Sequence, residues 1–104
     1  MSANLDFGIV HHFSDGVYAR QMELPKNHCA VTHAHEYDHL SILASGRVTV
    51  AIDGIDEEFV APACINIVAG KHHKIIALED SVWFCVHATD ETDPNKLDQV
   101  LIGG

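Results

Sequence analysis

Histidines carry the most informative chemistry in this chain. The string Thr32 to Gly46 reads T-H-A-H-E-Y-D-H-L-S-I-L-A-S-G and contains His33, His35 and His39, and His73 follows farther along the chain. In an extended strand, residues two apart point to the same face, so His33 and His35 would project side by side at a separation that one metal ion can bridge. Neutral imidazole is a common ligand for zinc, iron, copper and nickel. The spacing therefore predicts a metal site.

The imidazole donors narrow the choice of metal. Three or four imidazoles suit a divalent transition metal, namely iron, nickel, zinc, copper or manganese, whereas calcium and magnesium prefer oxygen ligands. An octahedral ion with three or four protein ligands keeps open positions for water or substrate, which is typical of a catalytic or sensing site. The residue types do not choose among the five metals.

The rest of the chain has the periodicity of β-strands. Short stretches of alternating apolar and polar residues are separated by turn residues, which is typical of an antiparallel sandwich or barrel. Asp53-Gly54 lies between two β-branched runs and predicts a two-residue hairpin. The predicted strands cover residues 16–24, 29–34, 39–44, 47–52, 56–60, 65–68, 74–78 and 81–88.

The predicted organisation is one all-β domain over residues 1–104, with a barrel core at about 16–88. A short C-terminal helix over 93–101 is expected, because Asp93 and Pro94 form a helix start and Leu97, Val100 and Leu101 follow at helical spacing.

The histidine string resembles the first motif of the cupin family, G-x5-H-x-H-x3,4-E-x6-G. The gaps from His33 through His35 and His39 to Gly46 all match, with His39 in the usual position of glutamate and Asn27 in that of the leading glycine. The second motif ends P-x-G-x2-H-x3-N. Here the stretch 68–77 keeps the gap from Gly70 to His73 but has valine for the proline and alanine for the asparagine.

The resemblance implies a small antiparallel jelly-roll (cupin) β-barrel with a metal near its centre. By matching positions, His33, His35 and His73 would be ligands, and His39 would be a fourth ligand in the glutamate position. An alternative role for His39 is to hydrogen-bond the ligands without touching the metal. All-histidine cupins include iron dioxygenases, and related sites hold nickel, copper or zinc. Small cupins usually pair, and exposed edge strands need covering, so a homodimer is expected.

Several further residues have two interpretations. His72 competes with His73 as a ligand, but strand alternation would point it outward. His87 is either a histidine at a strand end or an acid–base group in the pocket, on one face with Trp83 and Cys85. Tyr18 shares a face with Arg20 and could orient a substrate, or pack in the barrel or against a partner. Tyr18 and His87 are therefore the candidate catalytic residues, with Glu36 and Asp38 as further candidate bases.

Composition excludes some partners. The formal net charge of −9 disfavours nucleic acid and an anionic membrane surface. No apolar run reaches the length of a membrane span, and no secretory signal is visible. The number of cysteines is odd, which suggests that Cys29, Cys64 and Cys85 are reduced, buried thiols. These features predict a cytoplasmic protein with a small-molecule substrate or ligand.

Two functions from different classes follow. The first is a small-molecule enzyme that uses a divalent metal held by four histidines, dioxygenase-like if the metal is iron, or an isomerase or lyase if the metal is a Lewis acid. The second is a non-catalytic module that binds a metal or small ligand, with a purely structural metal as its extreme form. The lack of a clear general base weakens the isomerase and lyase alternative.

Overall fold

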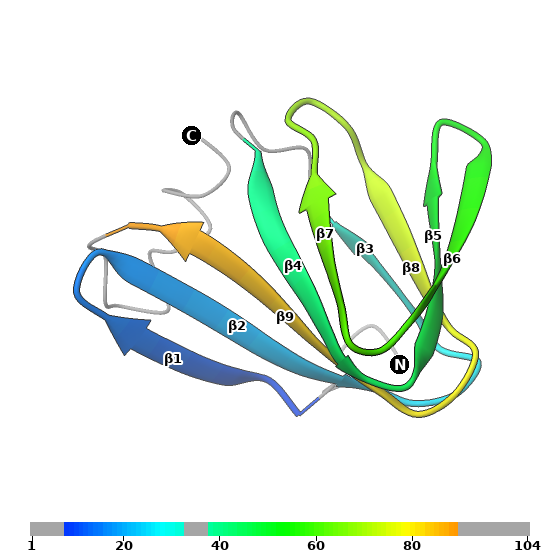
Figure 1. Cartoon of the computed structure of the whole chain (residues 1–104), viewed down its shortest axis with the longest axis horizontal. Helices are drawn as coiled ribbons and strands as arrows, with labels where there is room; N and C mark the ends of the chain where they lie inside the picture. The colour runs from blue at the N-terminus through cyan, green and yellow to red at the C-terminus, as the bar shows by residue number, and fades with distance from the viewer. Residues whose placement is uncertain (1–7, 33–37, 90–104) are drawn as a thin grey trace, which may run out of the picture.

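The computed structural model describes residues 8–32 and 38–89, which form nine β-strands (Figure 1). The strands are β1 Val10–Ser14, β2 Val17–Leu24, β3 Cys29–Thr32, β4 His39–Ser45, β5 Arg47–Ile52, β6 Ile55–Val60, β7 Ala63–Ile67, β8 His73–Ala77 and β9 Ser81–Ala88.

The strands form two sheets whose order gives a jelly-roll barrel. The five-stranded sheet has the order β1-β2-β9-β4-β7, and the four-stranded sheet has the order β3-β8-β5-β6. Every pairing is antiparallel. Apart from the β1–β2 and β5–β6 hairpins, each strand is followed in the sequence by a strand of the other sheet, so the fold depends on contacts between residues far apart in the sequence. The predicted all-β jelly-roll class is confirmed.

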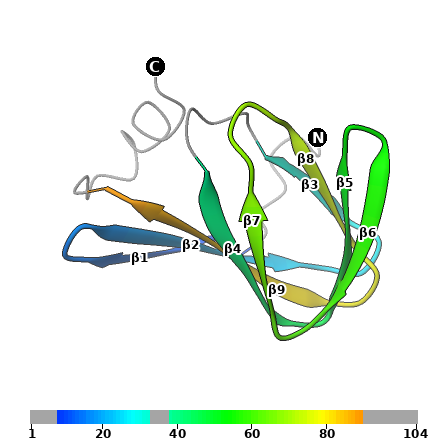
Figure 2. The same ribbon diagram turned by 45° about the horizontal axis from the view of Figure 1, so that its top comes forward.

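The sheets separate toward one end of the barrel, which we call the open end. The β5–β6 hairpin and the β7–β8 connection lie at this end (Figures 1 and 2). His39 begins β4 beside Ile67, the last residue of β7, and Thr32 ends β3 beside His73, the first residue of β8. His39 of the first predicted motif and His73 of the second therefore both lie at the open end.

The core lies between the sheets and follows strict alternation. Trp83 and Leu43 from the five-stranded sheet face Val50 and Ile75 from the four-stranded sheet, and all four are essentially fully buried. Full burial of side chains of this size is worth about 1.5–3 kcal/mol each for the aliphatic ones. This apolar centre holds the sheets together and leaves the open end to the polar side chains.

The strand predictions are mostly confirmed. The 47–52 and 81–88 strands are observed with those bounds, and the hairpin between β5 and β6 has Asp53 and Gly54 in the left-handed region, at φ 51° and 79°, as a type I′ turn requires. Strand β1 was not predicted. The predicted strand over 29–34 is observed up to Thr32, and its last two residues, like the predicted helix over 93–101, lie outside the described residues.

Three positions of the motifs have the backbone conformation that glycine favours. Gly46 and Gly70 have φ of 89° and 80°. Asn27, in place of the leading glycine, has φ of 71°, and asparagine tolerates this region better than most residues. Asn27, although it replaces the leading glycine of the motif, therefore preserves the backbone geometry of the motif.

No helix among the described residues is long and apolar enough to cross a membrane.

We predict that Gly46→Ala destabilises the fold far more than Gly54→Ala. Both residues have positive φ, so both substitutions carry a backbone strain of about 1 kcal/mol or more. At Gly46, however, a Cβ would lie 2.5 Å from the carbonyl oxygen of Asp80 and 2.8 Å from Cα of Ser81, whereas at Gly54 nothing lies within 4 Å. Urea unfolding would measure the difference in the free energy of unfolding. Equal losses would show that close packing at Gly46 has no energetic role.

Candidate metal centre and adjoining cavities

His39 points into the barrel from the start of β4. Its side chain is 5% exposed, and Ser41 and Leu43 follow on the same inner face. A buried imidazole needs polar partners or a metal, because burying an unsatisfied polar group costs on the order of 1–3 kcal/mol. The position is compatible with both roles considered for His39.

His73 is fully buried at the start of β8, while its neighbour His72 is exposed, as alternation predicted. The Nδ1 atom of His73 lies 3.3 Å from the carbonyl oxygen of Lys71. A carbonyl can only accept a hydrogen bond, so Nδ1 is the donor, and in the neutral ring Nε2 then carries the lone pair. This tautomer, fixed through the other ring nitrogen, is the usual state of a metal-ligating histidine.

His33 and His35 lie outside the described residues, and the strand that leads to them requires a correction. Alternation over the predicted strand 29–34 puts Cys29 and Val31 on the same face as His33, and the predicted metal site requires that face to point inward. Cys29 and Val31 are instead exposed on the outer face, because the register pairs β3 with β8 so that Ala30 packs against the core beside Ile75.

His87 lies beside His39, which the sequence did not predict. Its side chain is 5% exposed on the inner face of β9 with Trp83, and its ring centroid is 4.3 Å from that of His39. The reason is the pairing of β9 with β4, in which Leu40 is opposite Val86. Alternation with Trp83 could indicate that His87 points inward, but only the order of the strands in the sheet decides that His39 lies next to it. The position of His87 therefore fits the interpretation that it is an acid–base group in the pocket.

Tyr18 continues this row of rings toward β1. It is fully buried, its ring stacks on His87 at a centroid separation of 6.2 Å, and its hydroxyl oxygen accepts a hydrogen bond from Nε of Arg20 at 3.1 Å. The Nδ1 atom of His11 is 2.7 Å from the same oxygen. The predicted common face of Tyr18 and Arg20 is confirmed, and His11 is part of the same network.

Within residues 8–32 and 38–89, no group of three or more histidine, cysteine or acidic side chains is arranged to hold a metal ion. The described part brings His39 and His87 together and places His73 at the open end of the facing sheet. A complete ligand set would need His33 and His35.

The cysteines differ from the prediction of three buried thiols. Cys29 and Cys64 are exposed, and Cys85 is partly buried on the inner face of β9. Burial raises the pKa of the Cys85 thiol, and Ser41 donates a hydrogen bond to its sulfur at 3.8 Å. Cys85 is therefore held protonated near the site, and no disulfide is formed among the three.

Asp38 fastens the start of β4 to the β7–β8 connection. One carboxylate oxygen accepts a hydrogen bond from the backbone N–H of Ala69 at 2.8 Å, and the other accepts one from the amide of Asn66 at 3.1 Å. These bonds hold the pKa of Asp38 below its usual value. A carboxylate that is stabilised in its ionised form is a weak base, so Asp38 fits a structural role better than a catalytic one.

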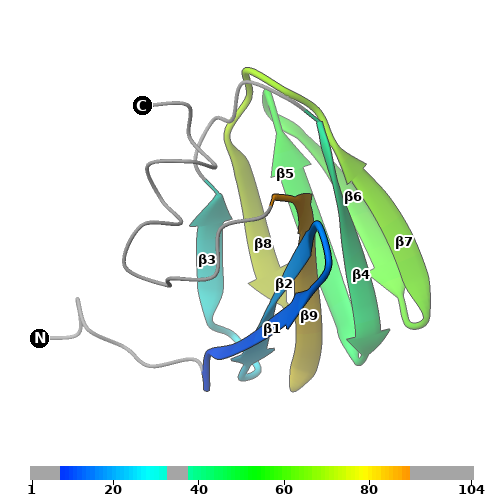
Figure 3. The same cartoon turned by 90° about the vertical axis from the view of Figure 1, so that its left-hand side faces the viewer.

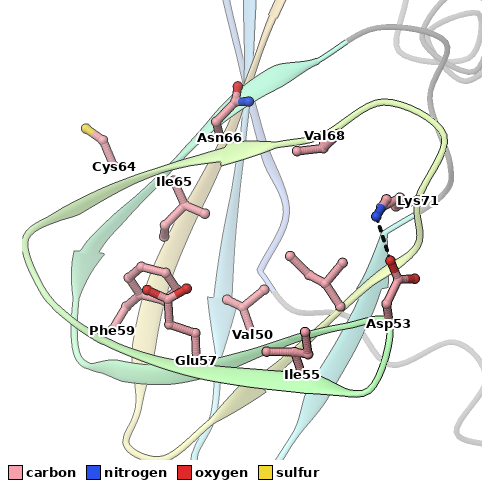
Figure 4. Close-up of a pocket in the computed structure, with 11 residues that line it drawn as sticks. Val50, Asp53, Ile55, Glu57, Phe59, Cys64, Ile65, Asn66, Val68 and Lys71 are labelled. Atoms are coloured by element: carbon pink, nitrogen blue, oxygen red, sulfur yellow. Dashed lines mark hydrogen bonds and ion pairs between the residues drawn. The ribbon is translucent and has the colours of Figure 1, made fainter.

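Two cavities adjoin this region. A shallow one of about 270 Å³ is lined by His39, His87 and Asp38 together with Val17 and Leu40. A larger one of about 500 Å³ lies between the β5–β6 hairpin and β7, with mostly apolar walls that include Val50, Phe59 and Ile65 (Figure 4). We call the larger one the apolar cavity.

The rim of the apolar cavity is polar. Nζ of Lys71 lies 2.6 Å from a carboxylate oxygen of Asp53, and this ion pair spans the rim from the β7–β8 connection to the hairpin turn (Figure 4). Both side chains are more than two-fifths exposed, so the pair contributes little to stability. Its place beside an apolar space of this volume resembles the general design of small-molecule sites.

The fold matches solved structures of cupins. A cupin-2 domain protein from Halorhodospira halophila has a TM-score of 0.70 at 16% identity, covering 92% of this chain and 76% of that one. A cupin 2 conserved barrel domain protein from Salinispora arenicola has a TM-score of 0.67 at 16% identity, with 92% of this chain and 85% of that one covered. A cupin-2 domain-containing protein from Shewanella frigidimarina has a TM-score of 0.67 at 14% identity, with 82% and 83% covered. No protein-family model and no curated protein matches the sequence. The chain therefore has the cupin fold.

We predict that Asp38→Asn destabilises the protein at neutral pH and that this effect disappears in acid. Since the folded-state pKa of Asp38 is lowered, its stabilising contribution is complete above the unfolded value of about 3.9 and is lost as the pH falls through the folded value. Urea unfolding of both proteins at a series of pH values from 6 downward would show the curves converging. A constant difference in the free energy of unfolding between the two proteins at all pH values would contradict the account. The Asn66→Ala substitution should raise the pKa of Asp38 toward its normal value.

Proposed function

We propose that this chain is a metal-binding cupin that acts on a small molecule, with one divalent transition metal ion held by His33, His35, His39 and His73. The fold and the two motif spacings support this proposal. So does the position of His39 and His73, which are both buried at the open end of opposite sheets. In the sequence, His33 and His35 lie between Thr32, which pairs with His73, and His39.

The bond from His73 to the carbonyl oxygen of Lys71 is the observation that carries the proposal. It leaves Nε2 as the atom with a lone pair in a buried, partly apolar setting, which is how proteins present imidazole to a metal. The net charge of −9 also favours a bound cation over a bound anion.

A bound ion would supply Lewis acidity, or oxygen activation if it is iron, and dioxygenase-like chemistry would follow in that case. The set of four neutral ligands leaves the choice among iron, nickel, zinc, copper and manganese open to measurement.

The chain's own residues would orient the substrate. His87 lies against His39 and lines the shallow cavity, and Tyr18 is held in place by Arg20 and His11, so these two are the candidate catalytic residues. Of the two, His87 would move a proton, and Tyr18, whose hydroxyl is already hydrogen-bonded, would orient the substrate.

The apolar cavity favours a second function, the binding of a small molecule without turnover. Its volume of about 500 Å³ lies within the usual range for small-molecule sites, and its walls come mainly from β5, β6 and β7. A binding module would use the same ion or cavity to hold a ligand. Substrate screens on the metal-loaded protein separate the two functions, because only an enzyme releases product in more than stoichiometric amount.

We predict that His73→Ala loses the bound metal and that His72→Ala keeps it. The two residues are adjacent, but His73 is buried with its tautomer fixed and His72 is exposed. Elemental analysis of both variants and of the wild type, each purified without a histidine tag, gives the metal content per chain. The double substitution of His33 and His35 by alanine should also abolish stoichiometric metal.

Metal retained by His73→Ala, or lost equally from both single variants, would move the site elsewhere. If the wild type takes up none of the five metals after reconstitution, the metal-binding proposal is wrong. Cooperative thermal unfolding of each variant serves as the control that the fold is intact.

A further inference from the structure

The apolar cavity lies where the edges of the two sheets face each other. The five-stranded sheet ends at β7 and the four-stranded sheet ends at β6, and no other described strand pairs with their free edges. Figure 3 shows β6 and β7 on the same side of the barrel. The residues that line the cavity, all of which are described, include no histidine. A molecule in this cavity would therefore contact side chains other than the proposed metal ligands.

Glu57 has an unexpected position on the wall of this cavity. The alternation along β6 turns Ile55, Glu57 and Phe59 toward the cavity (Figure 4). The register places Glu57 opposite Val50, which is 1% exposed in the core. An inner-face position with such neighbours normally holds an apolar side chain, so packing alone does not account for a carboxylate here.

Glu57 is also the one charged side chain of the cavity that has no hydrogen-bond or ion-pair partner within the described part of the chain. The other two, Lys71 and Asp53, form the ion pair of 2.6 Å at the rim and neutralise each other. The two carboxylates and one ammonium group leave the lining with a formal charge of −1. The cavity therefore combines apolar walls with one unpaired negative charge.

We propose that the apolar cavity binds a small molecule that carries an ammonium group on an apolar body. The ammonium group pairs with the carboxylate of Glu57 and lies near Phe59, because an aromatic ring attracts a cation through its π-electrons. The apolar body fills the space between β6 and β7. The proposal rests on the second function, binding in the apolar cavity, and adds the chemical class of the ligand.

Charge distinguishes a cationic ligand from the alternatives. The net charge of −9 raises the local concentration of cations around the chain. An anion would be repelled by Glu57, and it could pair with Lys71 only by competing with Asp53. A neutral ligand would remove water from the carboxylate of Glu57 and give it no partner, which is costly.

The apolar body is indicated by side chains at the mouth of the cavity. Ile55 at the start of β6 is 72% exposed, and Val68, just after β7, is 43% exposed. Both line the cavity, together with the buried Ile65. A ligand whose body covers these side chains removes apolar surface from water, which favours binding. The volume of about 500 Å³ lies in the usual range for small-molecule sites.

Three probes with the same apolar body separate the effect of charge from that of shape. They are phenylbutylamine, phenylbutanol and phenylbutyrate, and calorimetric titration of the full chain, with and without a chelator, measures the Kd of each. Glu57→Gln removes the charge and keeps the shape. Glu58→Gln is the matched control, because Glu58 is on the same strand but does not line the cavity, and its ion pair with Arg47 is exposed. Circular dichroism and cooperative melting check the fold of both variants.

We expect the amine to bind the wild type and Glu58→Gln at least about tenfold more tightly than the alcohol does. Glu57→Gln should bind the amine about as weakly as the alcohol, while its affinity for the alcohol stays that of the wild type. If the alcohol or the carboxylate binds the wild type as tightly as the amine, the cavity is a binding site but the proposed ligand class is wrong. Equal losses of amine affinity in both variants would assign the attraction to the net charge of the chain and also overturn the proposal. If no probe binds, the ligand class and the binding function of the cavity both fail.

Discussion

The alternation of side chains along antiparallel strands is the constraint on which this structure depends. Each strand sends every second side chain to the barrel interior, and the register between neighbours decides which of those side chains meet. His39 and Ser41 precede Leu43 on one inner face, and His73 precedes Ile75 on another. The same rule that fills the apolar core therefore delivers imidazoles to the open end, where the core stops.

The two motifs act through the backbone as much as through the histidines. Gly46 allows the chain to pass close to Asp80 and Ser81 at the end opposite the histidines, and Asn27 adopts a left-handed conformation in place of a glycine. Asp38 fixes the entry to β4 by accepting hydrogen bonds from Ala69 and Asn66. These turns set the register that brings His39 beside Ile67, and so they position the proposed ligands without touching them.

Much of the fold followed from local sequence signals, and the failures have physical causes. The hairpin at Asp53-Gly54 was predictable because its turn demands those residue types. Strand β1 was missed because its side chains are all exposed, so it has no apolar alternation to detect. The inward face of β3 was assigned wrongly because Cys29 and Val31 are apolar but point outward, and the contact of His87 with His39 depends on a strand order that periodicity does not encode.

The measurement that tests the metal-site account most directly is a crystal structure of the metal-loaded protein with diffraction data collected on both sides of the metal's absorption edge. The account predicts one anomalous peak inside the open end of the barrel, bonded to Nε2 of His73 and to His33, His35 and His39. A peak on the exposed thiols of Cys29 or Cys64, or the absence of any peak from protein reconstituted with each of the five metals, would contradict it.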